Sequence, residues 1–399
     1  MKLRFRMIAV SILVIFVLGA LFSAFAQEKA DDRKESKKEE GQPIRIGAIF
    51  AITGSASWLG EPERNTAVMY VEEINKAGGI NGRPIELIVE DTAGDETTAV
   101  NAVRKLISKD KVMAIIGPSR SGTSMAVLPI AEREGIPLLS CAAAESISEP
   151  IKKFVFKTPQ DDSDAAIRIF EHMKKKGYKK IAIMSGTTSF GSEGRKQLLK
   201  YAPEFGMEIV ADETYAPADT DMTPQIKKIQ GTGAEALVNW SIVPAQAIVA
   251  KNLRQLGMTI PLYQSHGFGN IRYVEAAGAA AEGIIFPAGR LLAAESVPET
   301  HPQKSVLMEY KKNYEARFKD PASTFGGHAY DALHILVAAI NRIEDEITPA
   351  KIRDEIEKTK GFVGTGGIFN YSPEDHCGLT KEAFEMLTVK NGKFVVLED

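Results

Sequence analysis

The stretch VMAIIGPSRSGTSMAVLPIAEREGIPLLS, residues 112–140, contains a complete strand, loop, helix and strand. VMAIIG and IPLLS are short apolar runs of the kind that form buried strands, and residues 122–134 between them have helical spacing. A strand followed by a helix and a second strand is the repeating unit of a parallel sheet. The stretch therefore predicts an α/β fold.

The loop GPSRSGTS joins the first strand to the helix and offers free backbone N–H groups to an anion. Gly117 and Gly122 are spaced as in a phosphate-binding loop, but Thr123 stands where that pattern requires lysine. A carboxylate needs fewer donors than a phosphate, and Ser119 and Ser121 supply hydroxyls. Two interpretations stay open from the loop alone: an anion site, or residues that only cap the helix.

The same alternation continues along the chain in two series. The first has strand-like runs at 44–50, 85–91, 112–117 and 136–140, with helical stretches at 62–77, 95–109 and 122–134. The second has strand-like runs at 180–185, 207–215, 236–240, 260–265 and 283–289, with helical stretches at 161–176, 190–204, 223–230 and 244–256. Each series predicts one lobe with a doubly wound parallel sheet. Residues 303–359 have a helical pattern, and Asn391-Gly392 predicts a hairpin turn.

The first 43 residues have a different character. Three basic residues precede an apolar run at 7–22, and an A-x-A pattern ends at Ala26, which predicts a cleavable signal peptide over 1–26 and a periplasmic protein. The alternative is an uncleaved membrane anchor, for which the apolar run is short. No cysteine lies near the cut, so no lipid anchor is expected. Residues 27–43 are charged and nearly free of apolar side chains, which predicts a disordered lead-in.

Composition limits the classes of function. Removing three of the 49 basic residues with the signal peptide leaves 46 against 52 acidic ones, a formal net charge of −6, and nothing favours nucleic acid as a partner. Apolar residues make up 44% of the chain, enough for a core in each of two domains. Cys141 and Cys377 are the only cysteines, and a disulfide and two free thiols remain open alternatives.

Catalytic patterns are missing from the sequence. It contains no H-E-x-x-H and no C-x-x-C, and Ser121 replaces the last glycine that a nucleophile elbow around Ser119 requires. Asp161, Asp162 and Asp164 open a helix, and capping explains them better than calcium does. We expect no enzyme activity, no cofactor and no metal.

Several longer stretches carry a family resemblance. They are IRIGAIFAITGSASWLG, AVMYVEEINKAGGINGRPIELIVEDT, AIIGPSRSGTS, GIPLLSCAAAES, TFGGHAYDAL and KGFVGTGGIFNYSPEDH, of which EEINKAGGINGRPIEL is the most specific. With these, the chain from 44 to 399 resembles the substrate-binding proteins of branched-chain-amino-acid-type ABC importers, the leucine/isoleucine/valine-binding group.

The resemblance implies a type I periplasmic binding protein, with two Rossmann-like lobes joined by three crossover strands and a ligand cleft between them that closes by a hinge. The implied first lobe is 44–160 plus 288–363, and the second is 161–287 plus 364–399. The implied crossovers lie near Thr158, Pro287 and Gly364.

The family's ligand contacts can be carried over residue by residue. The carboxylate clamp matches Ser119, Arg120 and Ser121, with Ser121 at the position whose hydroxyl and backbone N–H take the ligand carboxylate. The other matching positions are Trp58, Leu59, Ala142, Ala143, Ala144, Phe190, Ile242, His266, Gly267 and Phe325. For the aromatic residues, plain core packing is the alternative interpretation.

Three of these positions depart from amino-acid binders of the family. Ala144 replaces a threonine that helps to hold the ammonium, His266 replaces a glutamate, and Ile242 replaces a common tyrosine. The carboxylate half of the binding site is kept and the ammonium half is not evident, which predicts a carboxylate ligand without an α-ammonium. Glu145 or Asp331 is the alternative source of the missing negative charge.

Three classes of function follow. The first is the solute-binding component of an importer, a monomer whose partners are a small carboxylate and membrane permease subunits. The second is a ligand-sensing receptor module of the same fold. The third is a secreted enzyme, against which the missing catalytic patterns count.

Overall fold

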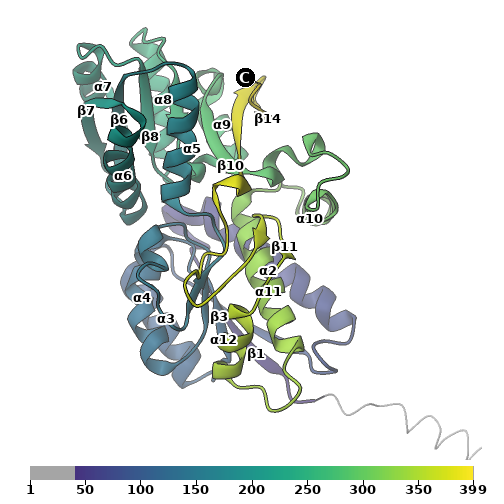
Figure 1. The fold of residues 1–399 in the computed structure, drawn as a ribbon. Helices are drawn as coiled ribbons and strands as arrows, with labels where there is room; N and C mark the ends of the chain where they lie inside the picture. Colours follow the sequence, from purple (N-terminus) through teal and green to yellow (C-terminus); the bar gives the residue numbers. More distant parts are fainter. Residues whose placement is uncertain (1–40, 399) are drawn as a thin grey trace, which may run out of the picture.

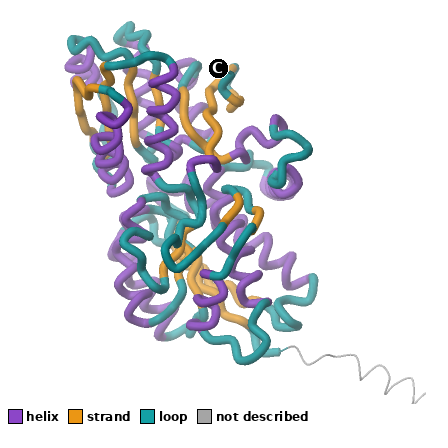
Figure 2. The backbone as a smooth tube through the Cα atoms, in the orientation of Figure 1, coloured by secondary structure: helices purple, strands orange, loops and turns teal. Residues whose placement is uncertain are grey.

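The computed structural model describes residues 41–398, which form two lobes, one above the other in Figure 1. The predicted signal peptide at 1–26 and most of the predicted lead-in at 27–43 lie outside the described residues. Strands lie in the middle of each lobe and helices flank them (Figure 2). The prediction of an α/β fold with two sheet-based lobes is therefore confirmed.

The first lobe is built on a five-stranded parallel sheet in the order β2-β1-β3-β4-β5. Its strands are β1 (Ile44–Phe50), β2 (Ile85–Asp91), β3 (Ala114–Ile116), β4 (Leu138–Ser140) and β5 (Val155–Lys157). Its longer helices are α2 (Ser57–Lys76), α3 (Glu96–Ser108), α4 (Ser121–Glu134), α10 (Lys304–Phe318), α11 (Thr324–Asn341) and α12 (Pro349–Glu357). Because helices cover both faces of the sheet, β1 and β3 are buried on both faces, and their sequences are nearly continuous apolar runs.

The second lobe is built on a seven-stranded mixed sheet in the order β14-β13-β10-β9-β8-β6-β7. Its strands are β6 (Lys180–Gly186), β7 (Glu208–Tyr215), β8 (Ala236–Trp240), β9 (Leu262–Gln264), β10 (Ile285–Gly289), β13 (Phe384–Lys390) and β14 (Lys393–Val396). Its helices are α5 (Asp162–Lys175), α6 (Ser189–Tyr201), α7 (Thr223–Gln230), α8 (Ala245–Gln255) and α9 (Ile271–Ala277). β13 and β14 form the predicted hairpin, whose turn residues Asn391 and Gly392 have φ of 52° and 71°, as a two-residue turn requires.

The chain passes between the lobes three times. The first passage follows β5, at Thr158, and the second follows β10, which contains Pro287 and ends at Gly289. The third differs from the predicted position near Gly364. Residues up to Ala383 belong to the apolar core of the first lobe, because β11 (Phe362–Val363) and β12 (Ile368–Phe369) form a hairpin that turns the chain back. The third passage is therefore just before β13, and the predicted boundary between 363 and 364 is corrected to about twenty residues later.

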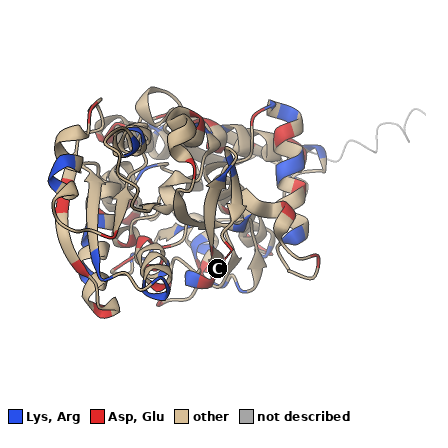
Figure 3. Cartoon of the chain, turned by 90° about the horizontal axis from the view of Figure 1, so that it is seen from above, with Lys and Arg blue, Asp and Glu red and all other residues tan. Residues whose placement is uncertain are grey.

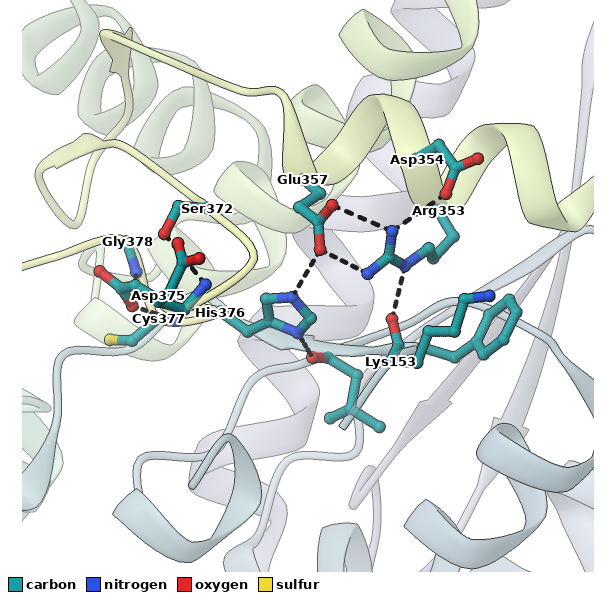
Figure 4. Close-up of polar contacts among 12 residues, drawn as sticks. Lys153, Arg353, Asp354, Glu357, Ser372, Asp375, His376, Cys377 and Gly378 are labelled. Carbon is teal, nitrogen blue, oxygen red and sulfur yellow. Dashed lines mark hydrogen bonds and ion pairs between the residues drawn. The ribbon is translucent and has the colours of Figure 1, made fainter. Parts of the chain in front are cut away.

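His376 binds the segment between β12 and β13 to the rest of the first lobe (Figure 4). Its Nδ1 donates a hydrogen bond of 2.7 Å to the carbonyl oxygen of Val155, at the start of β5. Its Nε2 lies 3.2 Å from Oε1 of Glu357, the last residue of α12, which also forms an ion pair with Arg353. The segment is therefore held by a buried polar network that spans more than 200 positions in sequence.

Basic and acidic residues are interspersed over both lobes in the view of Figure 3. Within residues 41–398 no helix is long and apolar enough to cross a membrane, and no cluster of three or more His, Cys, Asp or Glu side chains could hold a metal ion. Cys141 and Cys377 are buried free thiols, which decides between the two alternatives for them.

Candidate functional site

A cavity lies between the lobes. The loops and helix starts that follow β3, β4, β6, β8 and β9 contribute to its wall, so it lies at the carboxyl ends of strands, where doubly wound folds bind ligands. The residues that line it are Leu59, Ser119, Ser121, Cys141, Ala142, Ala143, Pro159, Phe190, Ile242, His266, Gly267, Phe325 and His328.

Ten of the thirteen residues that the sequence proposed for ligand contact line this cavity. They are Leu59, Ser119, Ser121, Ala142, Ala143, Phe190, Ile242, His266, Gly267 and Phe325. The fold brings them together from seven separate segments of the chain. Their contact with a ligand stays a prediction.

The other three predicted residues do not line the cavity, and their placement is corrected. The guanidinium of Arg120 donates to the carbonyl oxygen of Gly94 at 2.8 Å, because the loop after β2 passes beside the start of α4. The ring of Trp58 packs edge-on against Tyr273 of the second lobe, with centroids 5.2 Å apart. Ala144 is fully buried in the core of the first lobe.

The start of α4 presents donors to the cavity. No side chain caps this helix, because the residue at its N-cap is Arg120. Ser121 is its first residue, is 1% exposed, and has a hydroxyl without a hydrogen-bond partner. A helix start combines unpaired N–H groups with a partial positive charge. This end of the cavity is therefore suited to an anion such as a carboxylate.

Ser119 lies beside Ser121 but already has partners. Its Oγ accepts a hydrogen bond of 2.9 Å from the backbone N–H of Ala51 and is also hydrogen-bonded to Oε2 of Glu63. Glu63 is a fully buried residue of α2 that lies behind the cavity wall. Glu63 was not among the residues predicted from the sequence. It lies inside a regular helical pattern, which does not indicate that its side chain contacts the loop after β3.

Two histidines, one from each lobe, line the same cavity. His266 follows β9, and His328 lies on α11. Both ring nitrogens of His266 and Nδ1 of His328 are buried without a hydrogen-bond partner. Burial, and then the positive charge of Lys157, lower the pKa of each histidine to about 3, so both are neutral at pH 7. The sequence reasoning missed His328, although it lies one turn after Phe325 on the same helix face.

Lys157 contributes positive charge near the cavity. It is fully buried, donates to the carbonyl oxygen of Ala143 at 2.7 Å, and forms an ion pair with Asp161. Its charge lowers the pKa of both histidines, although burial is the larger cause. The positive charge of Lys157 would therefore disfavour an additional cation in the cavity.

Apolar side chains form the remaining wall. Phe190 packs edge-on against the ring of His266 with centroids 5.3 Å apart, and Ile242 lies beside Gly267. A Cβ at Gly267 would lie 2.4 Å from Cγ2 of Ile242 and 3.0 Å from the Phe190 ring, so glycine is needed there to bring this loop against its neighbours. The cavity combines a polar end with apolar sides, as small-molecule sites do.

Neither alternative source of negative charge lines the cavity. Oε2 of Glu145 accepts a hydrogen bond of 2.8 Å from Gln197 of the second lobe. Asp331 is buried and accepts hydrogen bonds from the backbone N–H groups of Thr365 and Gly366. Burial raises the pKa of Asp331 to about 7. Both carboxyls therefore have structural partners of their own.

Contacts between the lobes enclose the cavity. Arg272 of α9 forms ion pairs with Glu61 at 3.1 Å and Asp320 at 3.2 Å, both in the first lobe. Nδ2 of Asn270 donates to the carbonyl oxygen of Trp58 at 2.9 Å. These contacts join the rims of the two lobes, and we interpret the structure as a closed form.

Comparisons with known proteins agree with this geometry. A family model described as periplasmic binding protein matches residues 43–393. The chain is 25% identical over 330 residues to the leucine-, isoleucine-, valine-, threonine-, and alanine-binding protein of Pseudomonas aeruginosa, which covers 82% of this chain and 85% of the relative.

Two solved structures are similar over most of both chains. An extracellular ligand-binding receptor from Rhodopseudomonas palustris is 28% identical with a TM-score of 0.84, over 89% of this chain and 99% of that one. The branched-chain amino acid transporter substrate binding protein LivJ from Streptococcus pneumoniae, in complex with isoleucine, is 27% identical with a TM-score of 0.78, over 88% and 97%. The two lobes, the cavity between them and these matches show that the chain belongs to the periplasmic binding protein family, and within it to the branched-chain amino acid type.

Proposed function

We propose that this protein is the extracytoplasmic solute-binding component of an ABC importer. It captures a small carboxylate between its lobes, closes over it, and delivers it as a monomer to membrane permease subunits without chemical change. The single observation that carries the proposal is the cavity between the lobes whose wall contains buried polar atoms without partners, on Ser121, His266 and His328. Buried polar atoms of this kind are rare in proteins and are explained when a bound molecule satisfies them.

The proposed ligand is a carboxylate without an α-ammonium, such as a branched, aromatic or keto acid. The start of α4 and the Ser121 hydroxyl suit the carboxylate. The residues that line the cavity in the described part of the chain include no Asp or Glu, and both histidines there are neutral. The similar proteins from Pseudomonas and Streptococcus carry amino acids in their names or complexes, so this proposal separates the present chain from them.

Closure is tested with Cys141, which lines the cavity and is 2% exposed. In a Cys377→Ser variant, Cys141 is the only thiol, and a bound solute is expected to slow its alkylation by a maleimide at least about tenfold, because the closed lobes cover it. The probes are leucine and its keto acid, α-ketoisocaproate, with binding measured separately by calorimetry. A matched control is Thr300→Cys in a Cys141→Ser, Cys377→Ser background, where the exposed thiol should react equally with and without solute. An unchanged Cys141 rate with calorimetrically bound solute would contradict closure.

Ser121→Ala tests the carboxylate clamp. We expect a loss of about 1 to 3 kcal/mol in binding free energy, because a charged acceptor loses a hydrogen bond. Calorimetry with the bound acid measures this loss. Thr123→Val is the matched control, because the Thr123 hydroxyl donates to the carbonyl oxygen of Arg120 at 2.9 Å and does not line the cavity. Equal affinities for the wild type and the Ser121 variant would exclude this residue as the anchor.

A further inference from the structure

Glu63 carries a buried carboxyl group that has no direct contact with the cavity. It lies on α2, is 0% exposed, and does not line the cavity. Its Oε2 is hydrogen-bonded to Ser119, and its Oε1 is buried without a hydrogen-bond partner. Among the ion pairs within residues 41–398, none joins Glu63 to a cation, so no opposite charge there offsets the cost of burying a negative charge.

The groups that face Glu63 favour its neutral form. Burial raises the pKa of Glu63 well above its usual value, and the hydrogen bond from Ser119 opposes this only in part. The thiol of Cys141, at the end of β4, is close enough for the two groups to repel each other when both are ionised. A neutral Glu63 has one hydrogen to donate, and the Ser119 hydroxyl is the group to which it is bonded.

The hydrogen bonds of Ser119 then determine where its own hydrogen points. A hydroxyl accepts two hydrogen bonds and donates one. The N–H of Ala51 occupies the first acceptor position, at 2.9 Å. If Glu63 is neutral and donates, it occupies the second acceptor position of the Ser119 hydroxyl. The Ser119 hydrogen can then be donated to a group in the cavity. If Glu63 is ionised, it takes that hydrogen for itself.

We propose that Glu63 is a neutral positioning residue that donates to Ser119 Oγ and so turns the Ser119 hydroxyl hydrogen into the cavity, where it binds the ligand carboxylate beside Ser121. Glu63 thereby selects for an anion without touching it. An ionised Glu63 would remove one donor and place a second negative charge behind the carboxylate. The inference rests on the proposed function for the identity of the ligand as an acid.

The first test locates the proton and needs no solute. Infrared spectra at pH 7 of the wild type and of Glu63→Gln are compared in the region of the C=O stretch of protonated carboxyls. The expected result is one protonated-carboxyl band in the wild type that is absent from the variant. Burial raises the pKa of Asp331, Asp162 and Asp164 to about 7, so these carboxyls contribute to both spectra and cancel in the difference. Identical spectra would overturn the proposal.

The second test measures binding of α-ketoisocaproate by calorimetry. Glu63→Gln keeps a donor for Ser119, and its affinity is expected to stay within about threefold of the wild type at pH 7. Glu63→Leu removes the donor while filling the space, and its affinity is expected to fall about tenfold or more. Unfolding temperatures of both variants show that each is folded. A difference in affinity between the Glu63→Gln and Glu63→Leu variants indicates a positioning role. A residue needed only for packing would tolerate leucine at least as well as glutamine.

Other outcomes count against the inference. A gain of about tenfold or more in Glu63→Gln would mean that the wild-type residue is ionised and repels the acid. A loss of leucine binding in Glu63→Gln would mean that Glu63 is the counter-charge of an ammonium. If the wild type fails to bind the keto acid at all, the proposed ligand class fails, whereas the infrared difference still decides the state of Glu63 independently.

Discussion

α-Ketoisocaproate is expected to bind this protein more than about a hundredfold more tightly than leucine, because leaving an ammonium unpaired in a closed cleft costs about 3 kcal/mol or more. The two solutes differ only in a carbonyl against an ammonium at the α-carbon. His266 and His328 are neutral and line the cavity, and the charge of Lys157 behind the wall further disfavours a cation. Calorimetry with this pair, extended to phenylalanine, phenylpyruvate and benzoate, measures the preference.

His266→Glu provides the complementary test of ligand class. It introduces a carboxylate at the position where amino-acid binders of the family have one, and the preference for the keto acid over leucine should fall by at least about tenfold. His334→Gln is a control for the loss of a histidine, because His334 lies on α11 and does not line the cavity. Tight binding of leucine and no binding of ammonium-free acids by the wild type would show that the proposed ligand class is wrong.

Acid solution is expected to weaken ligand binding strongly. In the closed form the pKa of His266 and of His328 is about 3, whereas a histidine that faces water in an open cleft has a pKa of about 6.5. Closure therefore requires both neutral rings. The closed form keeps its full stability above about pH 6.5 and loses stability as the pH falls. Below that pH, each histidine lowers the ligand affinity by about tenfold for every pH unit. The affinity should drop about a hundredfold between about pH 7.5 and about pH 5.5, where the ligand carboxylate stays ionised.

Variants separate the two histidines from other titrating groups. His266→Gln and His328→Gln should each halve the slope of the logarithm of affinity against pH, and the double variant should remove it. The carboxyl of Asp331, with a pKa of about 7, lies within the first lobe away from the cavity, so its titration is expected to be similar in both forms and to cancel. His334→Gln should leave the profile unchanged. A wild-type affinity that does not change between about pH 5.5 and about pH 7.5 would contradict the proposal that His266 and His328 cause the loss of binding in acid.

The sequence by itself determined the fold class and much of the cavity wall. Strands such as VMAIIG and IPLLS are apolar throughout because both faces of the sheet are covered, and this local property survives in any tertiary arrangement. The place of the loop after β3 between a strand and a helix allowed either an anion site or simple helix capping, and the family resemblance favoured a carboxylate site; Ser121 lies at the helix start with an unpartnered hydroxyl. Asn391-Gly392 likewise predicted the hairpin through backbone preferences that act within four residues.

Only the tertiary structure decided which side chains face the cavity and which face elsewhere. Arg120 stands between two lining serines in sequence, yet its long side chain reaches a carbonyl of the neighbouring loop after β2. Glu63 and His328 join the site from α2 and α11, whose apolar periodicity indicates a buried face but not what that face meets. The third passage between the lobes depends on β11 pairing with β12 and on His376 bonding to β5, a contact between residues 221 positions apart. Local patterns predict elements, whereas long-range packing selects their neighbours, and the charge state of Glu63, His266 and His328 follows from those neighbours alone.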